Sequence, residues 1–312
     1  MRILLATDFS QYADTARALV RALALPAGSH VRVVHAIEPV TTVAMFAPAA
    51  IVTLTEAAEA EAKAEVAKAA QALVRAGVAA DAVVGFGRAA DVLVDECVSF
   101  KPDLLVAGTR GRGGIATSVL GSVSAELVDR APCPVLIARR DALTRLVLAE
   151  DGSTFAAAGA RAIVDLLPLR AAEVRVVSVV DVPFPVVFAD PTATSTAVEA
   201  YRAYEEALPQ LRETHTGLAR DRAKALEAEG LRVSYELREG DAASEIIAAA
   251  REQSADCIVI GSRGQTGVRR LLLGSVARSI LFHAPCSVLV VHDRGAEKKA
   301  PEPAREPAVA PA

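Results

Sequence analysis

Asp103-Leu-Leu-Val-Ala-Gly108-Thr-Arg-Gly111 is an apolar, strand-like run that ends in two glycines, and after nine more residues the chain reaches Gly121-Ser122. The same pattern returns as Asp256-Cys-Ile-Val-Ile-Gly261-Ser-Arg-Gly264, followed after nine residues by Gly274-Ser275. Each copy has the form G-x2-G-x9-G-S and leads into a helix-like run. Glycine allows the backbone to approach another group closely, and a helix N-terminus presents unpaired N–H groups. Two copies with one spacing therefore predict two equivalent loops.

The repeat extends well beyond this loop and indicates a duplication. A shift of 153 positions carries Gly108 onto Gly261 and also Ala131–Ile137 onto Ala284–Val290. Near the start of each unit the shift is 143 positions, which aligns Asp8 with Asp151. The second unit therefore holds about ten additional residues between its second and third strands, where an insertion lengthens a surface loop or a helix.

Apolar strand-like runs alternate with helix-like runs in both units, which predicts parallel sheets covered on both faces. The expected fold class is α/β, with two tandem doubly wound domains of five parallel strands, at residues 1–140 and 141–294. Residues 295–312, rich in Pro, Ala, Glu and Lys, are expected to form a disordered tail. Strands are expected at 2–7, 31–37, 79–84, 103–108, 134–139, 145–150, 174–180, 232–237, 256–261 and 287–292, and helices near 11–25, 54–76, 88–99, 121–130, 154–167, 197–229, 241–253 and 274–283.

The composition and net charge limit the class of protein to which this chain can belong. The 312 residues are 52% hydrophobic and 4% aromatic, which fits two alanine-rich α/β domains. A net charge of −4 provides no basic field for nucleic acid. Neither a signal peptide nor an apolar run of membrane-spanning length is recognisable, so a cytoplasmic protein that binds neither nucleic acid nor membrane is expected. The four cysteines form no C-x-x-C pair and are expected to be reduced and buried, without a metal.

The glycine loop has the features of a phosphate site. In an open parallel sheet, ligands bind outside the carboxyl ends of the strands, where loop N–H groups and the hydroxyl of Ser122 or Ser275 could hydrogen-bond phosphate oxygens. The alternative is structural, with the glycines forming a tight turn and the serine capping a helix. Asp8 and Asp151 end the first strand of each unit, where a carboxylate either accepts from ribose or base, or caps the next helix.

The strand-Asp start, the G-x2-G-x9-G-S loop and the later Ala-Pro-Cys-Pro-Val-Leu or Ala-Pro-Cys-Ser-Val-Leu strand resemble the universal stress protein family in its tandem two-domain form. The resemblance covers both units. It implies a Rossmann-like fold of the adenine nucleotide alpha hydrolase-like kind, with ATP along each loop; Mg²⁺ could arrive on the triphosphate itself. It also implies that the last strands, at Val135–Ala138 and Val288–Val291, pair the two units within one chain, and a homodimer is a further expectation.

The expected cofactor-binding residues combine the glycine loops with the strand ends that the resemblance implies. No catalytic residue and no metal ligand is expected. The cofactor-binding set is Thr7, Asp8, Ala36, Gly108, Thr109, Arg110, Gly111, Gly121, Ser122, Val123 and Ser124 in the first unit, and Glu150, Asp151, Val179, Gly261, Ser262, Arg263, Gly264, Gly274, Ser275, Val276 and Ala277 in the second.

The two units differ at positions that bear on ligand binding. Ser124 in the first unit corresponds to Ala277, so the first unit is expected to have one more phosphate donor. Phe9 stands where the second unit, like the family, has glycine after the aspartate. Arg110 and Arg263 either pair with phosphate or are solvated. The segments 39–53 and 183–196 are either flaps over the nucleotide or simple connections to the next helix.

The resemblance and the loops together favour an ATP-binding stress-response regulator that signals through nucleotide-dependent conformation or assembly with a protein partner. A slow ATPase or self-phosphorylating enzyme is an alternative, although the sequence contains no G-x4-G-K-[ST] loop and no Ser-His-Asp set shared by both units. A sensor of AMP or a cyclic nucleotide fits the same loops, because glycine N–H groups do not count phosphates.

Overall fold

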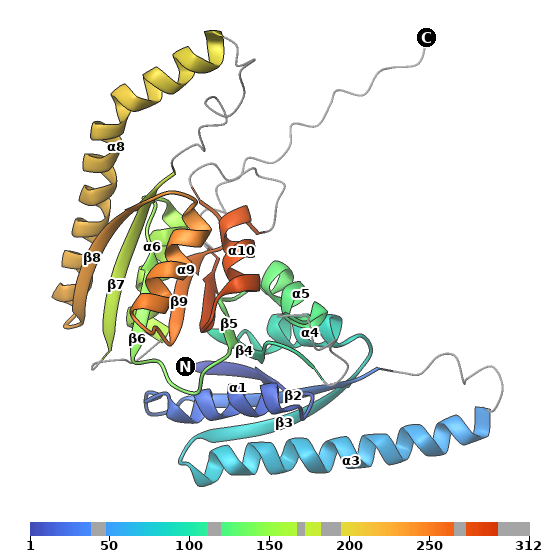
Figure 1. Ribbon diagram of the computed structural model, residues 1–312. Helices are drawn as coiled ribbons and strands as arrows, with labels where there is room; N and C mark the ends of the chain where they lie inside the picture. Colours follow the sequence, from blue (N-terminus) through green and yellow to red (C-terminus); the bar gives the residue numbers. More distant parts are fainter. Residues whose placement is uncertain (39–47, 112–119, 167–171, 182–194, 265–272, 293–312) are drawn as a thin grey trace, which may run out of the picture.

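A single ten-stranded sheet runs through the computed structural model, which describes residues 1–38, 48–111, 120–166, 172–181, 195–264 and 273–292 (Figure 1). The order of the strands is β3-β2-β1-β4-β5-β10-β9-β6-β7-β8. All neighbouring pairs are parallel except β5 and β10. The strands are β1 (Arg2–Ala6), β2 (His30–Ile37), β3 (Ala79–Phe86), β4 (Leu104–Gly108), β5 (Val135–Ala138), β6 (Arg145–Ala149), β7 (Glu173–Val180), β8 (Arg232–Glu239), β9 (Cys257–Gly261) and β10 (Ser287–Val291).

Helices cover both faces of the sheet. The helices α1, α3, α6 and α8 enclose one apolar core, and α4, α5, α9 and α10 enclose the other. The central strands β4, β5, β9 and β10 are buried at every residue, as expected for strands covered on both sides. The helices are α1 (Gln11–Ala22), α3 (Pro48–Arg75), α4 (Ala89–Phe100), α5 (Ser122–Arg130), α6 (Thr154–Leu166), α8 (Ser195–Ala228), α9 (Ala242–Glu252) and α10 (Ser275–His283).

In each unit, two neighbouring strands are followed by helices that lie on opposite faces of the sheet. In the first unit, α1 and α3 follow β1 and β2 on one face, whereas α4 and α5 lie on the other. The reversal therefore falls between β1 and β4, and in the second unit between the equivalent strands β6 and β9. The neighbouring first and fourth strands place the acidic strand end beside the glycine loop, as a doubly wound order requires.

The two units meet through their last strands. Val288 lies opposite Ile137, and Val290 opposite Val135, in an antiparallel ladder between β10 and β5. Beside this ladder, the Arg139 guanidinium donates to the Leu281 carbonyl at 2.6 Å. His292 forms the related contact in the opposite direction, with its Nε2 at 3.1 Å from the carbonyl oxygen of Val128, the residue equivalent to Leu281. The sheet and both cores are thus continuous between the units (Figure 1).

Every expected strand and helix is present, with ends that differ by a few residues. The additional residues of the second unit fall between β7 and β8 as predicted. They lengthen a helix, because α8 has 34 residues and the equivalent α3 has 28.

The four cysteines are free and buried. Residues 39–47 and 183–194 of the two expected flaps, and the tail at 295–312, lie outside the described residues. None of the helices in the described ranges combines the length and apolar character that a membrane crossing needs.

Candidate functional site

Both expected sites lie at the carboxyl ends of the neighbouring first and fourth strands of a unit. Asp8 follows β1 and Gly108 ends β4, while Asp151 follows β6 and Gly261 ends β9. The first and fourth strands pair directly in both units, with Ile3 opposite Leu104 and Leu146 opposite Cys257. The structure therefore brings each aspartate together with its glycine loop.

The second glycine of each loop packs against the aspartate. A Cβ added at Gly264 would lie 2.7 Å from Asp151 Oδ2, and one added at Gly111 would lie 2.8 Å from Asp8 Oδ2. Real Cβ atoms do not approach an oxygen this closely, so a larger residue would displace the carboxylate. Close approach to the aspartate is therefore a structural reason for glycine at this position in both units.

The other carboxylate oxygen holds the turn that leads into the helix. Asp8 Oδ1 accepts from the Ser10 N–H at 3.1 Å, and Asp151 Oδ1 accepts from the Ser153 N–H at 3.0 Å. The hydroxyl of Ser10 caps α1, and that of Ser153 accepts from the Ala156 N–H in the same way. The serines thus supply the caps, and the aspartates form the turn before them while facing the glycine loop.

The first glycine of each loop serves helix packing. A Cβ at Gly108 would lie 2.7 Å from the backbone carbonyl group of Tyr12, and one at Gly261 would lie 2.6 Å from Cβ of Phe155. Helices α1 and α6 can cross the strand ends this closely only because glycine has no side chain. The side chains of Thr109 and Ser262, which follow these glycines, are buried.

The closing Gly-Ser of each loop starts a helix without a side-chain cap. Gly121 donates its N–H to the Thr109 carbonyl at 2.7 Å, and Gly274 donates to the Ser262 carbonyl at 2.8 Å, so each loop is closed on itself. The N-cap residues of α5 and α10 are these two glycines, which have no side chain to cap the helix. The first three N–H groups of each helix precede its first internal hydrogen bond and are available to an anion, at the end where the helix dipole is positive. These N–H groups belong to Ser122, Val123 and Ser124 in α5 and to Ser275, Val276 and Ala277 in α10.

Ser124 does not provide the additional phosphate donor expected from the sequence. Its hydroxyl is buried and donates to the Gly108 carbonyl at 2.8 Å, which ties α5 to the end of β4. Ala277, at the equivalent position of α10, is also buried. Because the Ser124 proton is already engaged, the hydroxyl gives the first unit no advantage in phosphate donors in this conformation.

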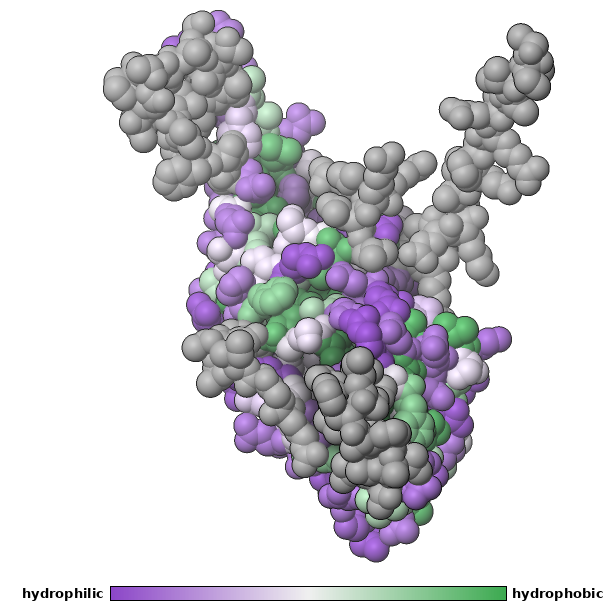
Figure 2. Space-filling view, turned by 90° about the vertical axis from the view of Figure 1, so that its right-hand side faces the viewer, coloured by the Kyte–Doolittle hydropathy of each residue, from purple (hydrophilic) through white to green (hydrophobic). Residues whose placement is uncertain are grey.

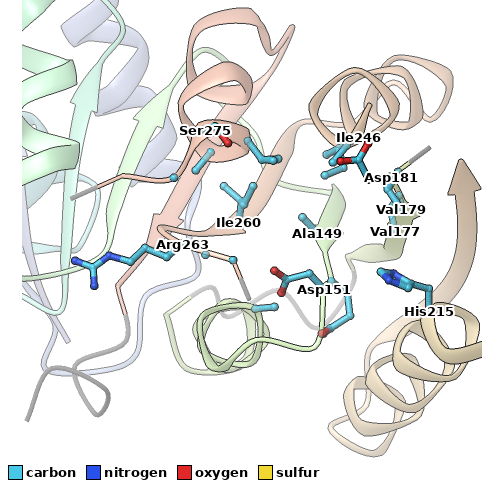
Figure 3. A pocket seen from close by; sticks show the side chains of 18 residues that line it. Ala149, Asp151, Val177, Val179, Asp181, His215, Ile246, Ile260, Arg263 and Ser275 are labelled. Carbon is cyan, nitrogen blue, oxygen red and sulfur yellow. The ribbon is translucent and has the colours of Figure 1, made fainter. Parts of the chain in front are cut away.

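A cavity of about 390 Å³ opens beside the loop of the second unit (Figure 3). Its volume lies within the range of small-molecule sites. Apolar side chains from β6, β7, β9 and α9 form much of its wall, and the start of α10 closes one side. The lining residues are Ala149, Glu150, Asp151, Ala156, Val177, Val179, Asp181, His215, Ala242, Ile246, Ile260, Gly261, Arg263, Gly264, Gly274, Ser275, Val276 and Ala277.

Polar groups from α8, from β7 and from the residue after β6 meet at the side of this cavity away from α10. The Glu150 carboxylate is almost fully buried, accepts from the Gly152 N–H at 2.7 Å and pairs with Arg222 at 2.5 Å. His215 Nδ1 lies 2.9 Å from the buried Ser178 hydroxyl. Burial lowers the pKa of His215, and nearby Asp151 partly offsets this shift. The imidazole is therefore neutral near pH 7.

The first unit is built differently at the same place. Thr7 Oγ1 accepts from the Phe9 N–H at 3.2 Å, in the role that Glu150 has toward Gly152. Phe9 adopts a left-handed backbone with φ of 62°, and its ring lies 4.5 Å from that of His35. His35 Nδ1 lies 2.8 Å from the Thr7 carbonyl oxygen, so this histidine has a local structural contact. Ala36 and its equivalent Val179 are both half-buried near the strand ends.

The loop arginines contact aromatic rings. The guanidinium carbon of Arg110 lies 4.7 Å from the centre of the Tyr12 ring, and that of Arg263 lies 5.7 Å from the centre of the Phe155 ring. Figure 3 shows the Arg263 side chain extending away from the wall that Val177, Val179 and His215 form. Both arginines thus lie against an aromatic ring, and Arg263 is not directed toward that wall.

The model of the universal stress protein family matches this chain at residues 1–139 and again at residues 143–292. The chain belongs to the universal stress protein family. A universal stress protein of Methanocaldococcus jannaschii is 33% identical over 148 residues, covering 47% of this chain and 81% of that protein. One from Mycobacterium tuberculosis is 27% identical over 210 residues, covering 62% of this chain and 63% of that protein.

Solved structures of universal stress proteins share the fold. One from Archaeoglobus fulgidus superposes with a TM-score of 0.64 at 20% identity, covering 93% of this chain and 98% of that one. A universal stress protein structure from Pseudomonas aeruginosa gives a TM-score of 0.56 at 19% identity, covering 93% of this chain and 92% of that one. At these identities the likeness supports the fold alone. Two tandem universal stress protein units in one mixed α/β chain are therefore shown from both sequence and structure.

His215 and Arg222 contribute to the site without having been expected from the sequence. Both lie on the inward face of α8, in register with the buried Ala219, Ala223 and Leu226. Comparison of the two repeats could have indicated them, because the 153-position shift aligns both with apolar residues of α3. A polar pair at positions that are apolar in the other unit is the pattern that could have revealed them.

Proposed function

We propose that this universal stress protein is an ATP-binding regulator with one adenine-nucleotide site in each unit, at the strand ends between β1 and β4 and between β6 and β9. The cavity of the second unit carries the proposal. It joins an uncapped helix N-terminus, suited to phosphates, to an apolar wall suited to a base. Asp151 lies between these parts, where a carboxylate can accept from ribose hydroxyls.

The residues present fit a nucleotide triphosphate in their chemistry. The N–H groups at the start of α10 would hold phosphate oxygens, and Val179 and Ile260 would contact the base. The loop glycines keep side chains out of the space beside Asp151, so a ligand can approach that carboxylate. We further propose that partners or a second copy of the chain recognise the nucleotide-bound form of the protein.

Titration calorimetry with ATP, AMP and cyclic AMP, run in parallel with a phosphate-release assay, tests the proposal. A regulator binds ATP with two sites per chain and releases phosphate far more slowly than it exchanges nucleotide. Tighter binding of AMP or cyclic AMP would favour the sensor, and sustained turnover would favour the enzyme. The absence of heat and of competition for all three nucleotides at millimolar concentration would overturn the proposal.

A further inference from the structure

Four residues at the side of the second-unit cavity away from α10 have no counterpart of the same chemistry in the first unit. They form two interacting pairs, one ionic and one hydrogen-bonded. The strand residues align by the 143-position shift and the helix residues by the 153-position shift. The four are Glu150, Ser178, His215 and Arg222, and the aligned residues of the first unit are Thr7, His35, Ala62 and Ala69.

The ionic pair fixes α8 against the end of β6. The Glu150 side chain is 1% exposed and that of Arg222 is 24% exposed, so their contact is largely shielded from water. His215 lies seven residues before Arg222, which is two helical turns and therefore the same face of α8. In the first unit Ala62 and Ala69 are buried and offer no polar group. The pair thus holds one specific side chain of α8 in place beside the cavity.

That side chain is His215, and its second nitrogen is available to a ligand. Nδ1 is engaged by the Ser178 hydroxyl, and the described residues form no hydrogen bond with Nε2. Figure 3 shows His215 reaching from α8 toward the cavity, near Val177, Val179 and Asp151. Ser275, at the phosphate-suited start of α10, lies on the other side of the cavity in the same view.

From this geometry we propose that His215 recognises the base of the nucleotide in the second unit, through a hydrogen bond between Nε2 and a polar atom on the edge of the base. The inference rests on the proposed nucleotide binding and assigns its recognition element. The Ser178 hydroxyl can donate to Nδ1 or accept from it, so Nε2 can serve as an acceptor or a donor toward the base. The first unit, with Ala62 at the aligned position, recognises its ligand without this contact.

The test compares ATP with inorganic tripolyphosphate, which carries the same phosphates and no base. Calorimetry on the full chain with His215→Leu is expected to show about tenfold weaker ATP binding at one of two sites, because one hydrogen bond to a desolvated group is lost. Tripolyphosphate affinity is expected to stay unchanged. His283→Leu, at an exposed histidine of α10 whose Nδ1 faces the Ser279 carbonyl, is the control and should change neither ligand.

His215→Asn retains a hydrogen-bonding side chain and should recover part of the ATP affinity. In proton NMR of the wild type, one of the five histidine ring signals, assigned by its loss in His215→Asn, should shift with ATP and not with tripolyphosphate. Unchanged ATP affinity in a folded His215→Leu protein, or an equal loss for both ligands, would overturn the inference. If the wild type binds tripolyphosphate and ATP equally, base recognition fails while the phosphate sites stand; if it binds neither, the proposed function itself fails.

Discussion

At the residue scale, one glycine in each unit sets the distance between the loop and the acidic strand end. Gly264 leaves just enough space for Asp151, whose other oxygen is held by the Ser153 N–H. The carboxylate therefore has one fixed position beside the cavity. Gly111, Asp8 and Ser10 are arranged in the same way in the first unit, so this contact is common to both repeats.

Replacing Gly264 by alanine should impair binding more than stability. The new Cβ would meet Asp151 Oδ2 at 2.7 Å, so the carboxylate must rotate away. We expect the free energy of unfolding to fall by about 1 kcal/mol or less, while ATP affinity in the second unit falls at least about tenfold. Denaturant unfolding and calorimetry measure the two quantities. Gly217→Ala in α8, where the nearest atom would be Arg220 Nη2 at 3.9 Å, is the control and should stabilise by up to about 1 kcal/mol.

The buried pair of Glu150 and Arg222 gives a prediction about stability. Arg222→Ala leaves an almost fully buried carboxylate without its cation, which should cost about 3–5 kcal/mol in urea unfolding. The double variant Glu150→Thr with Arg222→Ala introduces the residues that the first unit has at these positions, and should recover most of that loss. A double variant as unstable as Arg222→Ala alone would show that the uncompensated charge is not the cause.

At the element scale, α5 and α10 differ from α1 and α9 in how they begin. Ser10 and Asp241 cap α1 and α9 with their own side chains, whereas Gly121 and Gly274 leave α5 and α10 without such a cap. A glycine N-cap stabilises a helix less than a serine or aspartate cap, by a few tenths of a kcal/mol. Its position at the glycine loop in both units fits a helix end that a phosphate completes.

Ser275→Glu should therefore change stability and binding in opposite directions. A carboxylate in the first turn interacts favourably with the helix dipole, by about 0.3–1 kcal/mol, so thermal unfolding should be unchanged or slightly delayed. The same charge repels a triphosphate, and ATP binding in the second unit should disappear. Ser122→Glu should remove the other site, and the double variant both. Retained ATP affinity in Ser275→Glu would show that the start of α10 does not hold phosphate.

At the scale of the whole molecule, the ladder between β5 and β10 joins two similar units into one sheet, with α3 and α8 at opposite ends (Figure 1). On the face shown in Figure 2, polar and apolar described residues are interspersed. Each apolar core includes residues of both units, such as Leu136 and Leu289 in one of them. A change in one unit's loop can therefore reach the other unit through packed strands.

Arg139 is the side chain whose loss should loosen the two units. Its guanidinium donates to the carbonyls of Leu281 and Cys286 across the junction. Arg139→Ala should cost about 1–3 kcal/mol, because carbonyls at the junction lose their charged donor. Arg140→Ala, at an exposed neighbour whose backbone N–H alone contacts Ser287, should stay within about 0.5 kcal/mol. Urea unfolding of the wild type should show one transition; two transitions would contradict cooperative packing of the units.

The sequence predicted the order of the elements well because duplication gave every strand a second copy in matching context. From that order it also followed that the glycine loop returns to the start of the next helix and that Asp151 lies beside Gly264. The role of Ser124 could not be predicted, since a serine that donates to Gly108 and one that donates to phosphate look alike in sequence. His215 and Arg222 were missed because polar residues on a long helix usually face solvent, and only the fold turns this face of α8 inward.

The most direct test of the central claim is a crystal structure of the full chain with ATP and Mg²⁺ at saturating concentration. The triphosphate should lie within hydrogen-bonding distance of the N–H groups of Val276 and Ala277, with the base between Val179 and Ile260 and its edge toward His215. Density for ATP elsewhere on the protein, with the second-unit cavity empty, would contradict the claim.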